Sequence, residues 1–193
     1  MSAFDYYLIV INVIGALAYV INMILYRYTA EGQIDKALTV ISLLGGSLGI
    51  LMIILIFDRK AVKENMMSRV FIACVFVIQV VLFLMIKGHH ADNITIAFWN
   101  FFAQYKVLLI YLAIINFVTF VMYAVDKVNA AEHRFRIRIV TLLGLAFIGG
   151  SAGALLAMYL LRHKTKKDYF TVGIPLIMVM QVVVIFYMMN AGW

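Results

Sequence analysis

Six long apolar runs without a single charged side chain decide what this sequence can fold into. They cover residues 6–26, 37–57, 70–86, 107–125, 139–161 and 169–193. Each is close to the roughly 20 residues that an α-helix needs to cross about 30 Å of hydrocarbon. None alternates polar and apolar residues as the strands of a membrane barrel do. The sequence therefore predicts an all-α, polytopic membrane protein with six hydrophobic helical segments.

Composition excludes a soluble protein. Of the 193 residues, 66% are hydrophobic and 13% are charged, whereas soluble domains average about 45–50% and 25%. In a soluble chain the net charge of +7 would suggest nucleic acid, but basic residues beside membrane segments face anionic headgroups instead. We expect the lipid bilayer, with its anionic headgroups, as the partner and no nucleic acid. A homo-oligomer is left open.

The two halves of the chain repeat each other with a shift of 104 residues. Over 7–71 and 111–175 the ungapped match has 13 identical positions, including two GGSxG clusters at 45–49 and 149–153. Apolar bias alone would not align two such clusters in one frame. The sequence predicts a tandem duplication of a three-segment module. We expect a diverged first module at 1–88, a connecting loop at 89–105 with an interfacial aromatic helix, and a second module at 106–193.

Two topologies fit these segments. If all six cross the membrane, the repeats are inverted and the 16 Lys and Arg residues divide eight to eight, which leaves no orientation signal. If the second segment of each module turns at its GGSxG and re-enters, 14 lie inside and only Lys87 and Lys106 outside. The positive-inside rule favours this split. A bacterial inner-membrane protein with both termini outside is then expected.

The second half carries a YxxDK block at 123–127, a GGxxGA block at 149–154 and an RHKTxK block at 162–167. At these spacings it resembles small bacterial membrane proteins catalogued as domain-of-unknown-function family 1294. The family usually has one module, whereas this chain has two. The resemblance implies a fold and a set of residues but no activity. It also implies that single-module relatives dimerise to build what this chain builds by duplication.

Polar residues inside the apolar segments are the candidates for function, because helix breaks near the midplane between repeats often form binding sites. We expect a path or binding site lined by Asn12, Gly45, Gly46, Ser47, Asn116, Gly149, Gly150, Ser151 and Gly153. The alternative for the glycines is close packing of straight helices, since 149 and 153 have GxxxG spacing. Asn12 and Asn116 could equally hold helices together.

A second set of charges is expected at the inner mouth of that path. It comprises Asp126, Lys127, Arg136, Arg138, Arg162, His163, Lys164, Thr165 and Lys166. A carboxylate at the end of an apolar run needs a partner, and we expect Arg136, Arg138 or Lys164 beside Asp126. A structural ion pair is the alternative role for Asp126, and a headgroup anchor is the alternative for the 162–167 cluster.

No metal site, cofactor motif or nucleophile constellation is evident, and catalysis is not expected. The leading hypothesis is a small-solute or ion transporter or channel whose path lies between the two repeats. The rival is a non-transporting scaffold or regulator that binds anionic lipid or a partner membrane protein through its basic cytoplasmic face. An enzyme acting on lipid phosphate is a distant third, since no base is well placed.

Overall fold

The computed structural model describes residues 3–28, 35–58, 65–88 and 94–191. Every regular element in these ranges is helical, and none of the described residues forms a strand. Six helical segments are long and apolar enough to cross a membrane: Ala3–Leu25, Lys36–Ile56, Met66–Ile86, Lys106–Ala131, Ile139–Leu160 and Asp168–Asn190. The prediction of an all-α membrane protein with six hydrophobic segments is confirmed.

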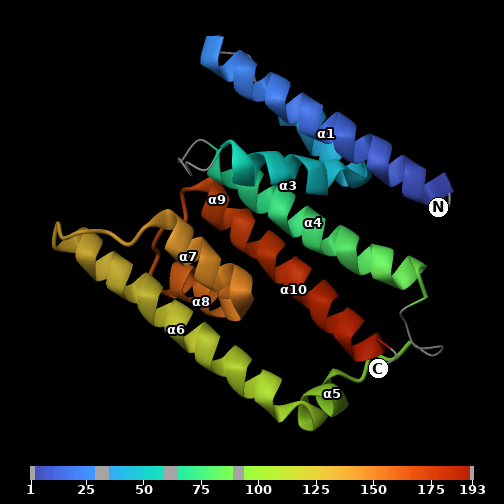
Figure 1. Cartoon of the computed structure of the whole chain (residues 1–193). Coiled ribbons are helices and arrows are strands. Elements are labelled where there is room, and N and C mark those ends of the chain that lie inside the picture. Colours follow the sequence, from blue (N-terminus) through green and yellow to red (C-terminus); the bar gives the residue numbers. More distant parts are fainter. Residues whose placement is uncertain (1–2, 29–34, 59–64, 89–93, 192–193) are drawn as a thin grey trace. The chain divides into compact units, whose positions relative to one another are not determined.

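The chain forms two compact units, residues 1–82 and 83–193 (Figure 1). The segment expected to connect two modules, 89–105, belongs to the second unit as far as the structure describes it. The long helix α4 (Met66–Ile86) carries the boundary between the units.

Unit 1 consists of one long helix, a broken helical pair and a second long helix. Helix α1 (Ala3–Tyr28) is followed by α2 (Asp35–Ile41), the turn η1 (Ser42–Gly46), α3 (Ser47–Ile56) and then α4. Both α3 and η1 pack against α1. A cluster of buried aliphatic side chains from three of these helices forms the core: Leu38, Ile50, Ile54 and Ile72.

Unit 2 has the same order of elements, preceded by a short helix. Helix α5 (Phe98–Gln104) leads into the long α6 (Lys106–Ala131). The broken pair follows as α7 (Ile139–Leu145), the turn η2 (Ala146–Gly150) and α8 (Ser151–Leu160). The short α9 (Asp168–Thr171) and the long α10 (Gly173–Asn190) complete the unit. As in unit 1, the second arm and the turn pack against the long helix, here α6.

The aromatic helix expected in the connecting segment is present as α5 (Phe98–Gln104). Its Trp99 is 87% exposed, whereas Phe101 is buried and stacks edge-on against Phe102. Just before it, the backbone N–H of Thr95 donates to Asn190 Oδ1 at 2.6 Å, and Asn190 Nδ2 donates back to the Thr95 carbonyl at 3.2 Å. This reciprocal pair ties the segment that leads into α5 to the last residue of α10.

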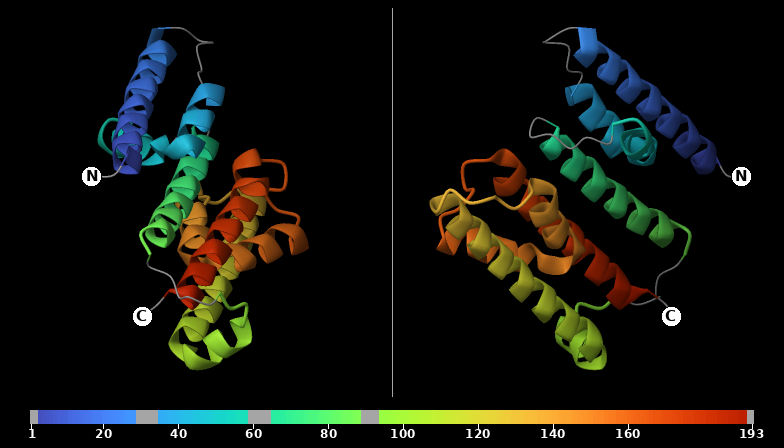
Figure 2. Two further views of the ribbon diagram at one scale, coloured as in Figure 1. Left: turned by 90° about the vertical axis from the view of Figure 1, so that its right-hand side faces the viewer. Right: turned by 60° about the vertical axis from the view of Figure 1, so that its left-hand side comes forward.

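Neither broken pair continues straight through its glycines. Figure 2 shows that the second arm leaves each turn in a new direction. In unit 2 the turn lies against Tyr111, Leu112 and Ile115 of α6. The chain just before α7 and just after α8 instead meets Asp126, about four turns further along α6. The pair therefore folds back, with both of its ends at the same end of α6.

Candidate functional site

The break between α7 and α8 occurs at one residue with a left-handed backbone. Gly149 has φ 133° and ψ −8°, a conformation that costs glycine little and other residues much. A break of this kind frees the last carbonyl groups of the first helix from their usual partners. In an apolar environment each freed group must find another donor.

Three side chains supply donors to the four carbonyls that precede the break. Gln181 Nε2 donates to the Ala146 and Phe147 carbonyls at 2.7 and 3.0 Å. The Tyr111 hydroxyl donates to the Ile148 carbonyl at 2.5 Å. Asn116 Nδ2 donates to the Gly149 carbonyl at 2.9 Å. The end of the first arm is thus capped by side chains from α6 and α10.

Asn116 also replaces a hydrogen bond that the break removes. In a continuous helix the N–H of Gly153 would donate to the carbonyl of Gly149, four residues earlier. Here the Gly153 N–H donates to Asn116 Oδ1 at 2.7 Å, while Asn116 Nδ2 reaches the Gly149 carbonyl. The side-chain amide therefore stands between donor and acceptor, as an inserted peptide group would.

The same contacts recur in unit 1. Gly45 has φ 117°, and the Gly49 N–H donates to Asn12 Oδ1 at 2.8 Å. The Tyr7 hydroxyl donates to the Leu44 carbonyl at 2.6 Å. Gln79 Nε2 donates to the carbonyls of residues 42 and 43 at 2.6 and 3.1 Å. Each serine that follows the glycine pair, at 47 and 151, hydrogen-bonds through its hydroxyl to the glutamine of its own unit.

The glycines also allow a close approach between helices. A Cβ atom added to Gly153 would lie 2.0 Å from the Asn116 carbonyl oxygen, and one added to Gly150 would lie 2.0 Å from Thr119 Oγ1. Gly49 stands in the same relation to the Asn12 carbonyl oxygen, again at 2.0 Å. Each GGSxG cluster therefore breaks its helix and also lets the second arm pack closely against the long helix. The sequence left these two roles as alternatives.

These contacts bring together the residues expected to line a path. Within each unit the asparagine, the serine and the glycines of the turn meet in one cluster, in which Asn12, Gly45 and Asn116 are half-buried and the others are buried. Its members are Asn12, Gly45, Gly46 and Ser47 in the first unit, joined by Gly49, which was not predicted, and Asn116, Gly149, Gly150, Ser151 and Gly153 in the second. The asparagine and serine side chains hydrogen-bond within their own unit. The arrangement holds a broken helix together.

Asp126 is the centre of a second cluster, at the opposite end of α6. Its side chain is fully buried. Its Oδ1 accepts the backbone N–H of Ile137 at 2.9 Å, and its Oδ2 lies 2.8 Å from His163 Nε2 and 2.7 Å from Lys164 Nζ. Of the three basic partners expected for Asp126, the structure selects Lys164. Arg136 and Arg138 are exposed.

The backbone around His163 bends sharply to make these contacts. Both Arg162 and Lys164 have positive φ, at 47° and 60°, which non-glycine residues adopt only when surrounding contacts hold them there. The Lys164 amine also lies 4.7 Å from the centre of the Phe170 ring. Burial lowers the pKa of Lys164 below its ordinary value, and Arg136 acts in the same direction, while Asp126 opposes both.

Unit 1 places a carboxylate at the corresponding end, but takes it from a different element. Asp58, just after α3, accepts a hydrogen bond from the Tyr19 hydroxyl at 2.8 Å and pairs with Arg69 of α4 at 2.9 Å. Tyr123, which follows Tyr19 by 104 residues, is fully buried, and its hydroxyl has no hydrogen-bond partner among the described residues. Where unit 1 has Asp58, unit 2 has the exposed Arg162.

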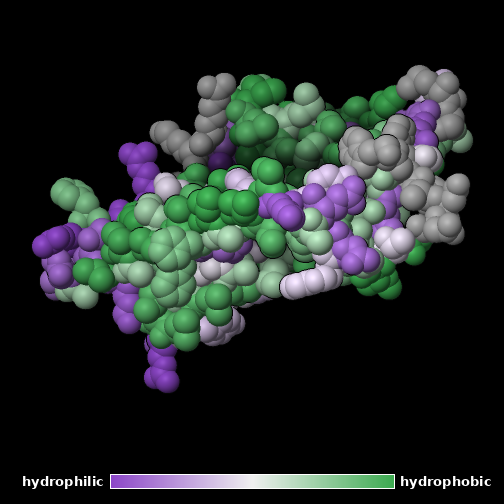
Figure 3. Space-filling view, turned by 90° about the horizontal axis from the view of Figure 1, so that it is seen from below, coloured by the Kyte–Doolittle hydropathy of each residue, from purple (hydrophilic) through white to green (hydrophobic). Residues whose placement is uncertain are grey.

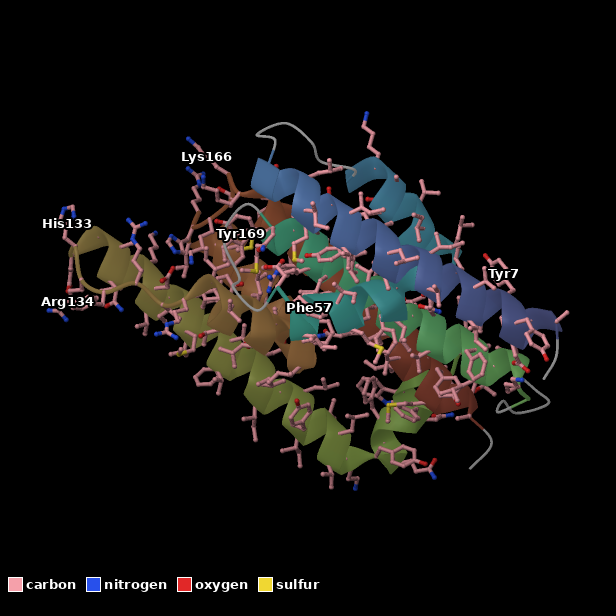
Figure 4. The ribbon with its side chains drawn as sticks, turned by 45° about the horizontal axis from the view of Figure 1, so that its top comes forward. Tyr7, Phe57, His133, Arg134, Lys166 and Tyr169 are labelled. Atoms are coloured by element: carbon pink, nitrogen blue, oxygen red, sulfur yellow. The ribbon has the colours of Figure 1, made fainter. Side chains whose placement is uncertain are left out.

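The remaining residues expected at the inner mouth form an exposed basic surface on unit 2. Lys127, Arg136, Arg138, Arg162, Thr165 and Lys166 are all exposed, whereas His163 and Lys164 are mostly enclosed. Figure 4 shows Lys166 pointing outward, and His133 and Arg134 at the far end of α6. Figure 3 shows hydrophobic residues over much of one face, with hydrophilic residues in smaller groups between them. Among the residues that the structure describes, no three His, Cys, Asp or Glu side chains are grouped as metal ligands.

Four side chains that cap the turns were not among the predicted site residues: the tyrosines Tyr7 and Tyr111 and the glutamines Gln79 and Gln181. Gln79 and Gln181 each stand in the middle of an apolar helix, and a buried amide in such a place needs partners. They lie 102 residues apart, so the 104-residue frame does not pair them. The signal was present in the sequence, because each is the one glutamine in its apolar segment.

Comparison with known proteins matches the second half of the chain. Residues 116–170 match a family described as "Protein of unknown function (DUF1294)". The chain is also 35% identical over 79 residues to the uncharacterized protein YsdA of Bacillus subtilis (strain 168). Those residues are 41% of this chain and 89% of that relative, which is therefore less than half as long. No solved structure matches the chain.

Proposed function

Since this chain belongs to the DUF1294 family of proteins of unknown function, we propose a function from its own geometry. It is a non-transporting protein of the bacterial inner membrane that binds anionic lipid headgroups through the basic inner end of unit 2. One observation carries this proposal. Residues 126–168 hold eight Lys and Arg against three Asp and Glu, while 27–69 hold six against four. Of those eight cations, Lys164 alone has a buried carboxylate as its partner.

The proposed topology gives each unit two membrane-spanning helices and one re-entrant helical pair. Its support is that the chain on both sides of the α7–α8 pair bonds to the same carboxylate, Asp126. Capping of the broken backbone by side-chain donors such as Asn116 and Gln181 answers the objection that a turn in hydrocarbon leaves polar groups unpaired. With both pairs re-entrant, 14 of the 16 Lys and Arg lie inside and both termini lie outside.

We further propose that the two units arose by duplication and are parallel repeats. The hydrogen bonds from Tyr7 and Asn12 in unit 1 recur from Tyr111 and Asn116 in unit 2. A relative less than half as long supports the idea that one module can exist as a separate chain. Such chains would then pair as homo-oligomers to form the equivalent of this protein.

Lipid binding is tested by native mass spectrometry and thermal unfolding of the detergent-purified protein, titrated with phosphatidylglycerol or phosphatidylcholine. We expect phosphatidylglycerol to bind in preference and to raise the unfolding temperature, because a ligand that binds only the folded state stabilises it. Replacement of Arg162, Lys166 and Lys167 by glutamine should remove most of this preference.

The matched control replaces Lys87 and Lys106, which the proposed topology places outside, with glutamine. This variant should retain the preference for phosphatidylglycerol. An equal loss in both variants would mean that net charge alone matters, and an absence of preference in the unmodified protein would refute the proposed function.

Passage of a small solute or ion is the second candidate. The observation in its favour is that both units interrupt an apolar segment with glycines at corresponding positions, an arrangement that transporters use to form binding sites. Ion flux into liposomes that contain the protein, compared with protein-free liposomes, tests it. If potassium and chloride each enter both kinds of liposome at the same rate, this candidate is left without support.

A further inference from the structure

The loop that joins α6 to α7 presents an aromatic side chain with no protein around it. Phe135 is 99% exposed, the highest value among the large hydrophobic side chains of the described residues. Phe135 lines a wide-open hollow together with Asn129, His133 and Arg134. The hollow thus combines an apolar wall with hydrogen-bond donors, which suits a phosphate group attached to an apolar tail.

Contacts at both ends hold this loop in place. On the α6 side, the Arg134 N–H donates to the Asn129 carbonyl at 2.9 Å, and the Arg134 guanidinium pairs with Glu132 at 2.9 Å. On the α7 side, the Ile137 N–H is held by Asp126. Phe135 lies between these anchors, so its backbone loses little conformational entropy when a ligand buries the ring.

The distance from Asp126 places Phe135 at the level of the lipid headgroups. Asp126 follows Lys106 by 20 residues of helix, about 30 Å, which is the thickness of the hydrocarbon core. Phe135 precedes Ile137 by two residues and so lies at most about 7 Å from it along the chain. The headgroup layer extends about 5–8 Å beyond the hydrocarbon on each side.

Arginine side chains flank the ring at this level. Arg136 and Arg138 are exposed and have no acidic partner among the described residues. Arginine binds phosphate through paired hydrogen bonds, and an aromatic ring between such residues is typical of segments that lie at a membrane surface.

From these observations we propose that the loop of residues 132–138 is a lipid-binding loop. The Phe135 ring inserts beneath the phosphates of the inner leaflet, while Arg136 and Arg138 bind the phosphates of anionic lipids. This inference rests on the proposed function and topology and assigns one site to them. An acidic protein segment in the same hollow is the competing occupant.

Insertion is tested with the full chain carrying Phe135→Trp, with Trp99→Phe and Trp193→Phe to remove other indole emission. The protein is reconstituted in phosphatidylglycerol bilayers with or without bromine on the acyl chains. We expect brominated lipid to quench the emission of the indole at position 135 and the emission maximum to lie at short wavelength. Strong quenching by aqueous iodide with no effect of bromine would overturn the inference and favour a protein partner.

Affinity is tested separately by native mass spectrometry with phosphatidylglycerol. Phe135→Ala should weaken binding about tenfold or more, as expected for loss of one buried aromatic side chain. The control Phe117→Ala removes a side chain that is 70% exposed in the middle of α6 and should leave this affinity unchanged.

The two experiments fail independently. If bromine does not quench the Phe135→Trp variant while phosphatidylglycerol still binds in preference to phosphatidylcholine, the loop assignment is wrong and the proposed function stands. If the unmodified protein shows no lipid preference while bromine does quench that variant, insertion of the ring is supported and anionic-lipid binding is refuted.

Discussion

The close contact between α6 and α8 makes Gly153→Ala the sharpest test of the glycine turn. The added Cβ would lie 2.0 Å from the Asn116 carbonyl oxygen, whereas ordinary contacts begin at 3.4 Å. The two helices must therefore move apart by about 1.4 Å, the difference of these distances. That movement also stretches the 2.7 Å bond from the Gly153 N–H to Asn116 Oδ1.

The expected loss of stability follows from these two effects. Overpacking of a tight contact costs about 1–3 kcal/mol, and a lost buried hydrogen bond costs about 1 kcal/mol more. The higher helix propensity of alanine offsets up to about 1 kcal/mol. We expect a net loss of about 1–3 kcal/mol, which corresponds to a fall of several degrees in Tm for a chain of this length.

Gly144→Ala is the matched control, because Gly144 lies in α7 and a Cβ there would meet nothing within 4 Å. The same exchange should leave stability unchanged or raise it by up to about 1 kcal/mol. Both variants are compared by thermal unfolding in one detergent, followed by circular dichroism. Equal stability of the two variants would refute the claim that the GGSxG cluster sets the helix spacing.

Three further predictions concern buried and half-buried polar groups, each measured by the same unfolding assay. Gln181→Met keeps the side-chain length but removes the donors to two carbonyls, and we expect a loss of about 2–4 kcal/mol; an unaltered Tm would show that water or another group caps the turn. Tyr123→Phe removes a hydroxyl without a partner among the described residues and should leave stability unchanged or raise it. Tyr19→Phe breaks the hydrogen bond to Asp58 and should cost about 1 kcal/mol. A larger loss from Tyr123→Phe than from Tyr19→Phe would contradict these hydrogen-bond assignments. Asp126→Asn removes the carboxylate that pairs with the mostly enclosed Lys164 and should cost about 3–5 kcal/mol. A small effect would show that the cluster is solvated.

The helices and the breaks could be predicted from sequence because they follow from local patterns. Charge-free runs of the right length locate the six segments. The glycine pairs at 45–46 and 149–150 mark where a turn is possible. Asp126 was correctly expected to need a basic partner, since an isolated charge at the end of an apolar run is unfavourable.

The remaining features depend on distances along the chain that sequence patterns do not encode. The ring of His163 reaches Asp126 from a loop in which Arg162 and Lys164 adopt positive φ, and the backbone N–H of Ile137 reaches it from the separate loop between α6 and α7. Gln79 and Gln181 escape the repeat frame because the chain from glycine turn to glutamine differs by two residues between the units. The hydrogen-bond partners of the asparagines, in the glycine turn and the arm that follows it, likewise could not be named from the sequence.

The shared attachment of both ends of the α7–α8 pair has a consequence for biogenesis. In the proposed topology the arginines at 134–138 and the basic residues at 162–167 stay on the side where the ribosome releases them. Moving each such cation to the bilayer centre would cost about 2.5–3.5 kcal/mol. The insertion machinery then has to translocate only the connection between α4 and α6, which has Lys87 and Lys106 at its ends, and the two termini. The pair itself can enter from the cytoplasm after α6 is in place, as a late docking step.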